Sequence, residues 1–572
     1  MKISITNFRR RWNIRPLNEK PTANRLSVFI VFLIVAAGVN AQGILGGHVT
    51  GNIQIDGQTS SRDTIIGANA VEEGLLLNAR ADVLYTNGNF SAGLRFEAYQ
   101  NPLPGFNAKY KGQGIANYFA SYNGSWLSVT AGTFYEQFGS GMILRAYEDR
   151  YLGMDNAILG FKLAVRPVNG LTIKGVFGKQ RYYWEWGDGL VRGVDAELNL
   201  NSIIKSFAEN KTRITIGGGF VSKYEKDETI LGENPEYKLN LPHNIGAGSV
   251  RLDLSHGGFN LQAEYARKGQ DPNVINNYIY REGQALFISA GYSQRGLSVN
   301  LQAKRVDNMC FKSVRSETGE MLYINYIPSI TKQHTYAFLS MYPYATQATG
   351  EMGLQGDFMY KIKKGTALGG KYGTDLHLNA SVITGIETNM IGGRGTDGYT
   401  SHFFKPGTLY YSDINFEVNK KISQKIKLAV TYGFIKFNPI VEGHAGEIHN
   451  NHVVVGDLTW KVNSKHVLRF EAEWLGSNSL YDKNVDDKRC GDWIMGLIEY
   501  NFTSKLFVSV SDQWCYKDGI GNYYNISLGY THKATRIQVG YGKQREGIIC
   551  IGGVCRQVPA ANGLTFSLST SF

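Results

Sequence analysis

The chain of 572 residues has little proline and little cysteine, with 13 Pro and 5 Cys, and only 19% of its residues are charged. After residue 41, no apolar run reaches the roughly 18 residues that a membrane-spanning helix needs, which excludes a protein that crosses a bilayer with helices. A soluble chain of this length would usually divide into several domains. No linker, composition shift or low-complexity segment marks such a division, so we expect one continuous domain.

Motifs for catalysis are also missing. The sequence has no Gly-x-Ser-x-Gly elbow, no His-Glu-x-x-His and no phosphate-binding loop. Its acids and histidines have no order that singles out a catalytic triad, so we do not expect an enzyme. Half of the formal net charge of +12 lies in the first 25 residues, and the rest forms no basic stripe of the kind that nucleic-acid binding needs. We therefore predict no cofactor and no nucleic-acid partner.

The first 41 residues have the pattern of a secretory signal peptide. Seven basic residues and one acid, Glu19, precede an apolar run from Leu26 to Val39, which is followed by Val39-Asn40-Ala41. A basic segment, a short apolar segment and small residues before the cleavage point define such a signal, with cleavage expected after Ala41. The alternative is a membrane anchor, but 14 apolar residues are too few to span a bilayer comfortably.

The chain is rich in segments in which apolar and polar residues alternate. It has 67 Gly and 12% aromatic residues, and several segments alternate apolar and polar positions over seven or more residues. In Phe259–Tyr265 and Leu297–Lys304 the apolar residues share one face of a strand, because successive strand residues point to opposite faces. An antiparallel sheet with a hydrocarbon face and an aqueous face has this signature. A soluble sandwich has it too, so strand number and loop length must decide.

We count about 24 strands (22–26) between residues 48 and 572. Short turns such as Asn87-Gly88-Asn89 and Arg295-Gly296 alternate with long connections such as 140–156 and 309–349. Periplasmic turns and extracellular loops of bacterial barrels alternate in this way. Residues 42–572 are thus predicted to be all-β, a single transmembrane antiparallel β-barrel. Strands begin near His48, which leaves no room for an N-terminal plug domain. A hidden hairpin around Thr335 to Tyr344 would make 26 strands.

The last nine residues resemble the closing strand of bacterial outer-membrane barrels. Leu564, Phe566, Leu568 and Phe572 share one face, while Thr570 departs from the pattern. In those proteins the C-terminal aromatic residue is the signal that the insertion machinery reads, a role that the resemblance implies for Phe572. The expected location is the bacterial outer membrane, with its lipid and its insertion machinery as partners.

Polar strand positions are predicted to line the lumen. Both signs of charge are interleaved among them, so no strong ion filter is evident; the alternative to a conducting path is that these charges pair across strands and fill the interior. The candidates on strands are Arg80, Asp82, Arg95, Glu97, Lys174, Asp195, Glu197, Glu264, Lys304, Asp413, Glu417, Arg469, Glu471 and Glu473.

The loop 138–157 mixes apolar residues with charges. Met142, Ile143, Leu144 and Leu152 would be unnecessary in a purely solvated loop. We predict that this loop folds inward and narrows the lumen; a compact outer lid is the alternative. The candidate constriction residues on it are Arg145, Glu148, Asp149, Arg150 and Asp155.

Five cysteines are compatible with the oxidising periplasm. Cys550 and Cys555 lie in the last outer loop and are predicted to form a disulfide. Cys490 and Cys515 flank a hairpin centred near Thr503-Ser504, so we predict a second, cross-strand disulfide, which leaves Cys310 over. Neither pair has the spacing of a zinc site.

Three histidines and an acid gather in one outer loop. His444, Glu447, His449 and His452 have a spacing at which imidazole and carboxylate groups can bind zinc or copper. Solvated loop histidines are the commoner case.

Residues 138–157, Gly178-Lys-Gln-Arg181 and Gly552 to Pro559 resemble segments of an outer-membrane barrel family of unknown function found in Bacteroidota. The resemblance covers nearly the whole chain and implies location and fold, but no substrate or site residue. We predict a porin-like channel for small hydrophilic solutes. The alternative is a non-conducting barrel that acts as a scaffold for a partner in protein secretion or cell-envelope assembly.

Overall fold

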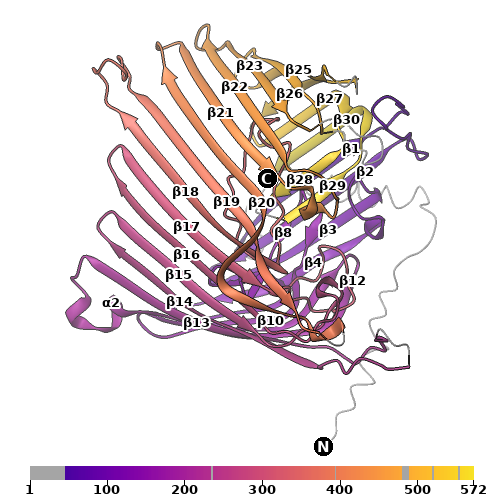
Figure 1. The fold of residues 1–572 in the computed structure, drawn as a ribbon, viewed down its shortest axis with the longest axis vertical. Coiled ribbons are helices and arrows are strands. Elements are labelled where there is room, and N and C mark those ends of the chain that lie inside the picture. The colour runs from indigo at the N-terminus through magenta and orange to yellow at the C-terminus, as the bar shows by residue number, and fades with distance from the viewer. Residues whose placement is uncertain (1–45, 233–235, 393–394, 480–488, 518–520, 552–553) are drawn as a thin grey trace, which may run out of the picture.

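A closed antiparallel barrel of 24 strands dominates the computed structural model (Figure 1). The structure describes residues 46–232, 236–392, 395–479, 489–517, 521–551 and 554–572. The predicted strand number is confirmed. The expected signal peptide, residues 1–41, lies outside the described residues, so both the signal and the lack of a plug domain before the barrel stay predictions.

The barrel strands follow one another around the ring in chain order. The first half consists of β1 (His48–Gln58), β2 (Leu76–Asn87), β3 (Phe90–Asn101), β4 (Gly112–Asn123), β5 (Leu127–Phe134), β10 (Ile158–Val168), β11 (Leu171–Tyr182), β12 (Glu185–Asn199), β13 (Thr212–Tyr224), β14 (Asn244–His256), β15 (Phe259–Lys268) and β16 (Gly283–Gln294). The second half consists of β17 (Leu297–Asp307), β18 (Gly350–Ile362), β19 (Thr374–Met390), β20 (Tyr399–Lys421), β21 (Ile426–Phe437), β22 (His449–Lys461), β23 (Val467–Ser477), β24 (Trp493–Asn501), β25 (Leu506–Cys515), β26 (Gly521–His532), β27 (Thr535–Gln544) and β30 (Ala561–Ser571).

Three small strand pairs and a few short helices lie in the connections. The pairs are β6 (Glu136–Phe138) with β7 (Leu144–Ala146), β8 (Glu148–Asp149) with β9 (Met154–Asp155), and β28 (Gly547–Ile551) with β29 (Val554–Val558). The helices are η2 (Ala108–Tyr110), α2 (Leu200–Ile203), η3 (Lys205–Phe207), η4 (Val274–Asn276), η5 (Gly395–Asp397) and η6 (Pro439–Glu442). Among the described residues, no helix is long and apolar enough to cross a bilayer.

The barrel closes where its first and last strands meet. β1 pairs with β30 from Asn52 opposite Ser571 to Gln58 opposite Thr565. Gly51 and Phe572 extend this seam through two backbone hydrogen bonds, of 2.9 and 3.0 Å. Closure leaves no unpaired strand edge, which is the condition for a sheet to stand in hydrocarbon.

We expect the substitution Gly51→Val to weaken this seam. A Cβ atom at Gly51 would lie 2.2 Å from the Cζ atom of Phe572, so the aromatic ring would have to move. The measurement is the folded fraction on unheated SDS gels after refolding into lipid. Gly456→Val on β22 is the matched control, because a Cβ atom there meets nothing within 4 Å. Equal folding of the two variants would contradict the seam argument.

Side chains alternate between an apolar outer face and a polar inner face. On β23, Phe470 and Trp474 are exposed on the outside, while Glu471 and Glu473 are buried on the inside. Exposed aromatic residues form two belts, as in membrane-spanning barrels. One belt lies near the short turns and contains Tyr122, Phe259, Tyr292, Tyr360, Trp460 and Tyr530. The other lies in the opposite half and contains Phe220, Tyr265, Tyr432, Trp474, Trp514 and Tyr541.

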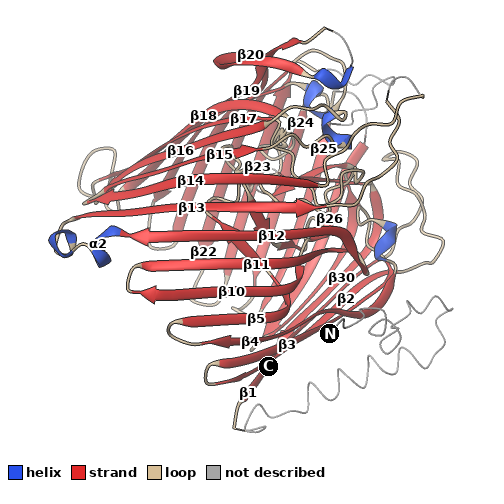
Figure 2. Cartoon of the chain, turned by 90° about the horizontal axis from the view of Figure 1, so that it is seen from below, coloured by secondary structure: helices blue, strands red, loops and turns tan. Residues whose placement is uncertain are grey.

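Short turns gather at one mouth of the barrel and long loops at the other, as Figure 2 shows. We call these mouths the turn side and the loop side. The turn side also holds the connection 200–211 with α2 and η3, which is longer than a tight turn. The alternative of a hairpin around Thr335 to Tyr344 is wrong: residues 308–349 are all described, and their only β-pairing is an isolated bridge between Lys312 and Tyr323.

Candidate functional site in the barrel lumen

Two loops enter the barrel from the loop side and fill its middle. The first lumen loop is residues 135–157 and the second lumen loop is residues 308–349. The first reaches across to β15, where the backbone N–H of Ser140 donates to Glu264 Oε2 at 2.7 Å. The second reaches β23, where the backbone N–H of Phe338 donates to Glu473 Oε2 at 2.8 Å. The loop 138–157 therefore folds into the lumen, as predicted.

The two lumen loops pack against each other around an apolar core. The Arg145 N–H donates to the Ile324 carbonyl at 2.8 Å, and the Tyr326 N–H donates to the Gly141 carbonyl at 2.9 Å. Met142, Ile143 and Leu144 are fully buried and belong to one hydrophobic cluster with residues of the second loop. This core explains why the first loop carries apolar residues, and it makes the two loops one packed body.

Seven charged side chains join the first lumen loop to the wall of β2, β3 and β11. We call this cluster the partition; it consists of Arg80, Asp82, Arg95, Glu97, Glu148, Asp155 and Arg181. Arg181 holds Glu97 and Asp155, each at 2.7 Å. Arg95 lies 2.6 Å from Asp82 and 3.2 Å from Glu148. Arg80 also pairs with Glu148, at 2.5 Å.

Charge in the partition is nearly balanced, with three guanidinium groups against four carboxylates. Burial by itself raises the pKa of Asp155, but Arg181 and Arg95 hold that pKa below its usual range. Asp155 is therefore ionised at neutral pH. Buried ions in such a network keep their place because removing one partner leaves another charge uncompensated.

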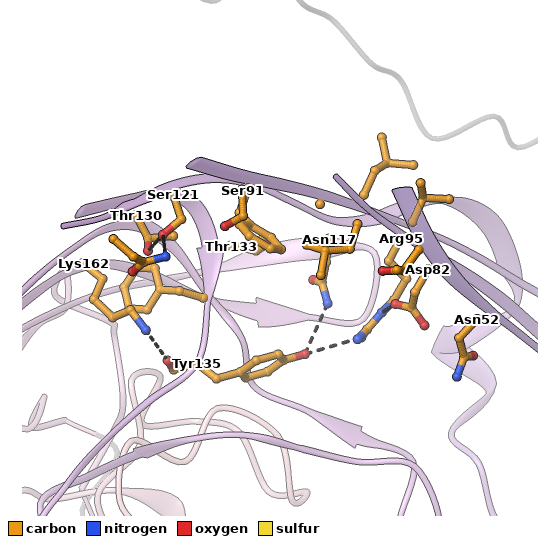
Figure 3. Close-up of a pocket in the computed structure, with 18 of the residues that line it drawn as sticks. Asn52, Asp82, Ser91, Arg95, Asn117, Ser121, Thr130, Thr133, Tyr135 and Lys162 are labelled. Carbon is orange, nitrogen blue, oxygen red and sulfur yellow. Dashed lines mark hydrogen bonds and ion pairs between the residues drawn. The ribbon is translucent and has the colours of Figure 1, made fainter. Parts of the chain in front are cut away.

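Two cavities lie on either side of the partition. The turn-side cavity has a volume of about 1230 Å³ and contacts Asp82, Arg95, Asn117 and Tyr135. In Figure 3, the hydroxyl group of Tyr135 points toward Arg95 and Asn117. The Lys162 ammonium group donates to the backbone carbonyl of Tyr135. The loop-side cavity has a volume of about 470 Å³ and contacts Arg80, Glu97, Glu148, Asp155 and Arg181. No residue lines both, so the partition separates two hollow spaces along one wall.

A metal ion has no place in the partition. Oxygen atoms of Glu97, Glu148 and Asp155 lie within 4.8 Å of one another, which is close enough to share a cation. Arg80, Arg95 and Arg181 already bind these oxygens. The guanidinium groups supply the positive charge that a metal would bring.

The remaining lumen candidates on the strands also face inward. Lys304 pairs with Glu351 at 2.5 Å and donates to the Pro328 carbonyl of the second lumen loop at 2.6 Å. Glu471 pairs with Arg469, which also holds Asp457 at 2.8 Å. Glu264 and Glu473 accept from loop N–H groups, as described above.

The candidates on the first lumen loop have different positions. The Arg145 guanidinium carbon lies 4.3 Å from the ring centre of Tyr147 and 4.0 Å from that of Tyr326, so it holds the two loops together. Asp149 accepts from the backbone N–H of Leu152 at 3.0 Å. Arg150 donates to Gln54 of β1 at 3.1 Å and borders the loop-side cavity.

The prediction that the histidines of the outer loop bind a metal ion is wrong. His449 is buried and faces inward against Phe437 and Tyr342. His452 faces outward, where it stacks on Phe434 with 4.6 Å between ring centres. Because the two residues are three positions apart on one strand, their side chains leave from opposite faces. Neither they nor His444 and Glu447 belong to a close metal-ligating group in the part of the chain that the structure describes.

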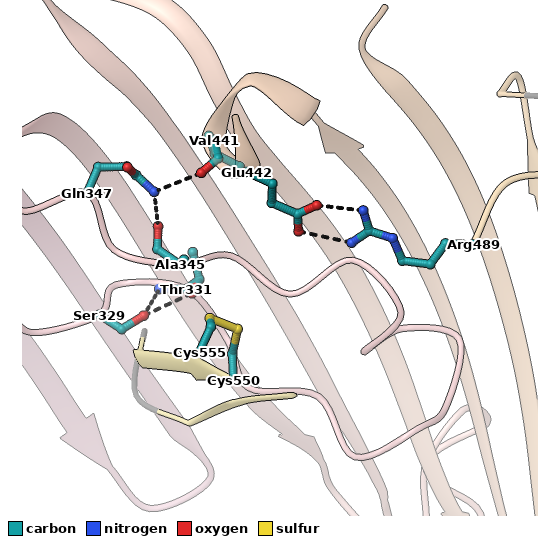
Figure 4. Close-up of a disulfide and its surroundings, with 9 residues drawn as sticks. All are labelled: Ser329, Thr331, Ala345, Gln347, Val441, Glu442, Arg489, Cys550 and Cys555. Atoms are coloured by element: carbon teal, nitrogen blue, oxygen red, sulfur yellow. Dashed lines mark hydrogen bonds and ion pairs between the residues drawn. A yellow bond between two sulfur atoms is a disulfide. The ribbon is translucent and has the colours of Figure 1, made fainter. Parts of the chain in front are cut away.

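One of the two predicted disulfides is confirmed. Cys550 and Cys555 are bonded and close the hairpin β28–β29, which lies beside the second lumen loop (Figure 4). The prediction of a disulfide between Cys490 and Cys515 is wrong. Trp493 lies opposite Cys515, and Cys490 comes before β24 begins. The Sγ atom of Cys515 lies 3.9 Å from the Cys490 carbonyl oxygen.

Sequence reasoning missed the lysines that fix the second lumen loop. Lys223 and Lys268, both fully buried, lie 2.9 and 3.4 Å from Asp271. Lys223 also donates to the Lys312 carbonyl at 2.7 Å, and Lys268 to the Cys310 carbonyl at 2.6 Å. Both lysines lie at the loop-side ends of strands, at positions whose side chains point into the lumen. The alternation of apolar and polar residues along these strands could have identified them.

Asp271→Asn should destabilise the protein at neutral pH by roughly 3–5 kcal/mol, because two buried ammonium groups lose their shared anion. Burial raises the pKa of Asp271, but Lys223 and Lys268 hold it below its usual range. A carboxyl group with a lowered folded-state pKa stabilises above its unfolded pKa and loses that effect as pH falls through the folded value. The difference between wild type and variant should therefore shrink below about pH 4.

The measurement is the free energy of unfolding in urea at several pH values. Asp227→Asn is the control, because Asp227 is an exposed partner of Lys238. A wild-type advantage that is the same at pH 3 and pH 7 would contradict this account.

Solved structures similar to this chain come from Pseudomonas aeruginosa. OpdL is 11% identical, with 68% of this chain and 94% of that chain covered and a TM-score of 0.36. OccK8 (OprE) is 8% identical, with 92% and 98% covered and a TM-score of 0.33. The siderophore receptor PirA is 8% identical, with 92% and 80% covered and a TM-score of 0.37. These scores are too low to transfer a function.

No curated protein matches the sequence. A family model does, over residues 23–572, which is nearly the whole chain. The chain therefore belongs to the family of unknown function DUF6029.

Proposed function

We propose that this protein is a porin-like channel of the bacterial outer membrane for small hydrophilic solutes, closed in the described state by its two lumen loops. One observation carries the proposal: two cavities, each lined in part by charged side chains, lie on the same wall on either side of the partition. Ion pairs of the first lumen loop hold that partition, so moving the loop would join the two spaces. No catalytic activity is proposed.

The outer surface supports the membrane location. Its two aromatic belts with apolar residues between them suit a hydrocarbon layer with two interfaces. Every barrel strand has two partners in the sheet, so lipid would meet no open edge. We propose outer-membrane lipid as the surroundings and recognition of Phe572 by the insertion machinery.

A scaffold without conductance is the second candidate. The packed core of the two lumen loops favours it, because a body fixed by buried ion pairs suits a permanent plug. In that case the loop side would present a surface to a partner in secretion or envelope assembly.

Single-channel conductance in a planar bilayer tests the proposal. Phe134 and Ile158 are paired across β5 and β10, so a two-residue Asn-Gly turn can replace residues 136–156 without moving either strand. We expect small or rare steps from the wild type and larger steps from the variant. Silence from both proteins would contradict a channel, and crosslinking for an envelope partner would follow.

A further inference from the structure

The two cavities come closest to each other beside the barrel seam. We call the inward faces of β27, β30 and β1 the seam wall. On β1, Asn52 lines the turn-side cavity, and Gln54, the next inward residue, lines the loop-side cavity. On β30, Ser571 lines the turn-side cavity and Ser567 lines the loop-side cavity, with Ser569 between them on the same face. Successive inward residues of one strand are roughly 7 Å apart, so this gap is short.

The strand register shows that these residues face the lumen. Gln54 lies opposite Arg80 of the partition on one side and opposite Ser569 on the other. Ser567 in turn lies opposite Gln538 of β27. Directly opposed residues of an antiparallel pair have their side chains on the same face. The seam wall is therefore continuous with the wall that carries the partition.

Hydroxyl and amide groups dominate the seam wall. Its side chains that are charged at pH 7 are Asp56 and Arg536, one of each sign. Asp56 accepts a hydrogen bond from the Ser567 hydroxyl at 2.7 Å. Arg536 lies opposite Ser569, is exposed and donates to Gln538 at 3.3 Å. The seam wall therefore has no net charge.

The charges around the seam wall are balanced or distant. Arg80 and Asp82, next to it on β2, pair with each other at 2.8 Å. The loop-side cavity is lined by four arginines and five carboxylates, and the turn-side cavity by four cations and two carboxylates. Three of the turn-side cations, Lys162, Arg166 and Lys174, lie on β10 and β11, five and six strands from β1. A solute at the seam wall therefore meets no strong excess of either sign.

Hydrogen bonds join the first lumen loop to the seam wall at one point. Arg150 donates to Gln54 at 3.1 Å, and the Arg150 side chain is 43% exposed. The ion pairs that hold this loop run instead to β2, β3, β10 and β11. In the part of the chain that the structure describes, no ion pair joins the loop to β27, β30 or β1. Moving the loop away from the seam wall therefore breaks one hydrogen bond and none of these ion pairs.

One hydrogen-bond acceptor at this gap lacks a donor. The side-chain oxygen of Asn52 is buried and has no hydrogen-bond partner among the described residues. In Figure 3, Asn52 lies apart from the bonded groups around Tyr135. A buried carbonyl without a donor costs free energy, so a hydroxyl group that reaches this level would be stabilised there.

We infer that solutes pass along the seam wall, through the gap beside Ser569, and that this route favours uncharged, hydroxyl-bearing molecules such as polyols. Their hydroxyl groups exchange hydrogen bonds with water for hydrogen bonds with the serine and amide side chains of the wall. An ion of the same size loses hydration at the gap, where the wall has no excess charge to compensate it. The inference rests on the proposed channel function and names its route and its solute class.

Ribitol entry into proteoliposomes, followed by osmotic swelling, tests the route. Ser569→Cys is refolded first and then treated with methanethiosulfonate ethyltrimethylammonium, so an effect of the attached group cannot come from failed folding. We expect the treatment to slow ribitol entry roughly fivefold, because the width of a pore limits passage. Treated wild type controls for the three buried cysteines, Cys310, Cys490 and Cys515.

Ser255→Cys is the matched control for position. Ser255 faces the lumen on β14, because it shares the face of Arg251, which lies opposite Glu264. It is nine strands from β1, so its treatment should leave ribitol entry unchanged.

Potassium ribonate tests the solute class, because ribonate is an anion of nearly the same size as ribitol. Valinomycin is added so that potassium does not limit the entry of the salt. We expect ribitol to enter roughly tenfold faster than ribonate, since the loss of hydration costs an ion more than a hydroxyl group. Equal rates would overturn the preference for uncharged solutes.

The remaining outcomes separate the route from the channel. Equal effects of the treatment on Ser569→Cys and Ser255→Cys, or no effect on either, would overturn the route and leave the channel standing. Ribitol entry only after removal of residues 310–347 would also overturn the route, since the seam wall lies open to the first lumen loop without that removal. No entry through either protein would overturn the channel itself.

Discussion

Replacing Arg181 with methionine should lower the free energy of unfolding by roughly 3–5 kcal/mol, the usual cost of removing one partner from a buried ion network. Arg181 is 2% exposed, and its guanidinium group binds both Glu97 and Asp155. Without it, two buried carboxylates lose a shared cation. Methionine fills much of the same volume, so packing contributes little to the loss.

The measurement is urea-driven unfolding from lipid, followed by tryptophan fluorescence. Arg267→Met is the matched control, because Arg267 forms an exposed ion pair with Glu282. Exposed pairs contribute no more than about 1 kcal/mol. A loss for Arg181→Met no larger than that of the control would show that the partition does not hold the loop. The same variant should also conduct more often than wild type, since the first lumen loop would be released.

Removing the second lumen loop should convert the protein into a wide, permanently open pore. This loop reaches Lys304 on β17, Asp413 on β20 and Glu473 on β23, so it spans a large part of the lumen. Its two ends are adjacent: the Asn308 N–H donates to the Thr349 carbonyl at 2.9 Å, and the Met309 N–H to the Ala348 carbonyl at 2.8 Å. Residues 310–347 can therefore be replaced by an Asn-Gly turn that keeps the hairpin of β17 and β18.

Single-channel recording checks this expectation. We expect steps several times larger than any from the wild type, with little closing. Shortening the turn-side connection 364–372 between β18 and β19 is the control, because most of its residues are exposed and none belongs to the lumen loops. Unchanged conductance after removal of 310–347 would mean that another path carries ions or that the barrel collapses, and the aromatic fluorescence of the refolded protein would separate the two.

The barrel was predictable from the sequence because its pattern is local. Phe470, Glu471 and Ala472 already show that an apolar outer face alternates with a polar lumen face, since side chains alternate on every strand. Turn residues such as Arg295-Gly296 fix where strands end. Repetition along the chain supplied the strand number, and the confirmed Cys550–Cys555 disulfide followed from nearness in sequence.

Sequence reasoning found every partition residue except the one that joins the others. The six predicted as lumen residues are Arg80, Asp82, Arg95, Glu97, Glu148 and Asp155, but Arg181, which binds two of them, was not among the candidates. Arg181 and Glu97 are 84 residues apart, and no periodicity connects them. Loop docking depends on such distant pairs. The failed Cys490–Cys515 bond has a related cause, because a strand that begins three residues later than expected moves the cysteine out of register.

The seam between β1 and β30 has a consequence for how the chain reaches its final form. Asn52 and Ser571 are partners, so the contact that closes the ring joins positions almost a whole chain length apart. Such pairings have the highest loop-closure entropy and fold slowly. Until the last strand arrives, the first and twenty-third strands each offer an open row of amide and carbonyl groups, which is a template for aggregation. These two open edges are therefore the part of the barrel most prone to wrong pairing before the ring closes.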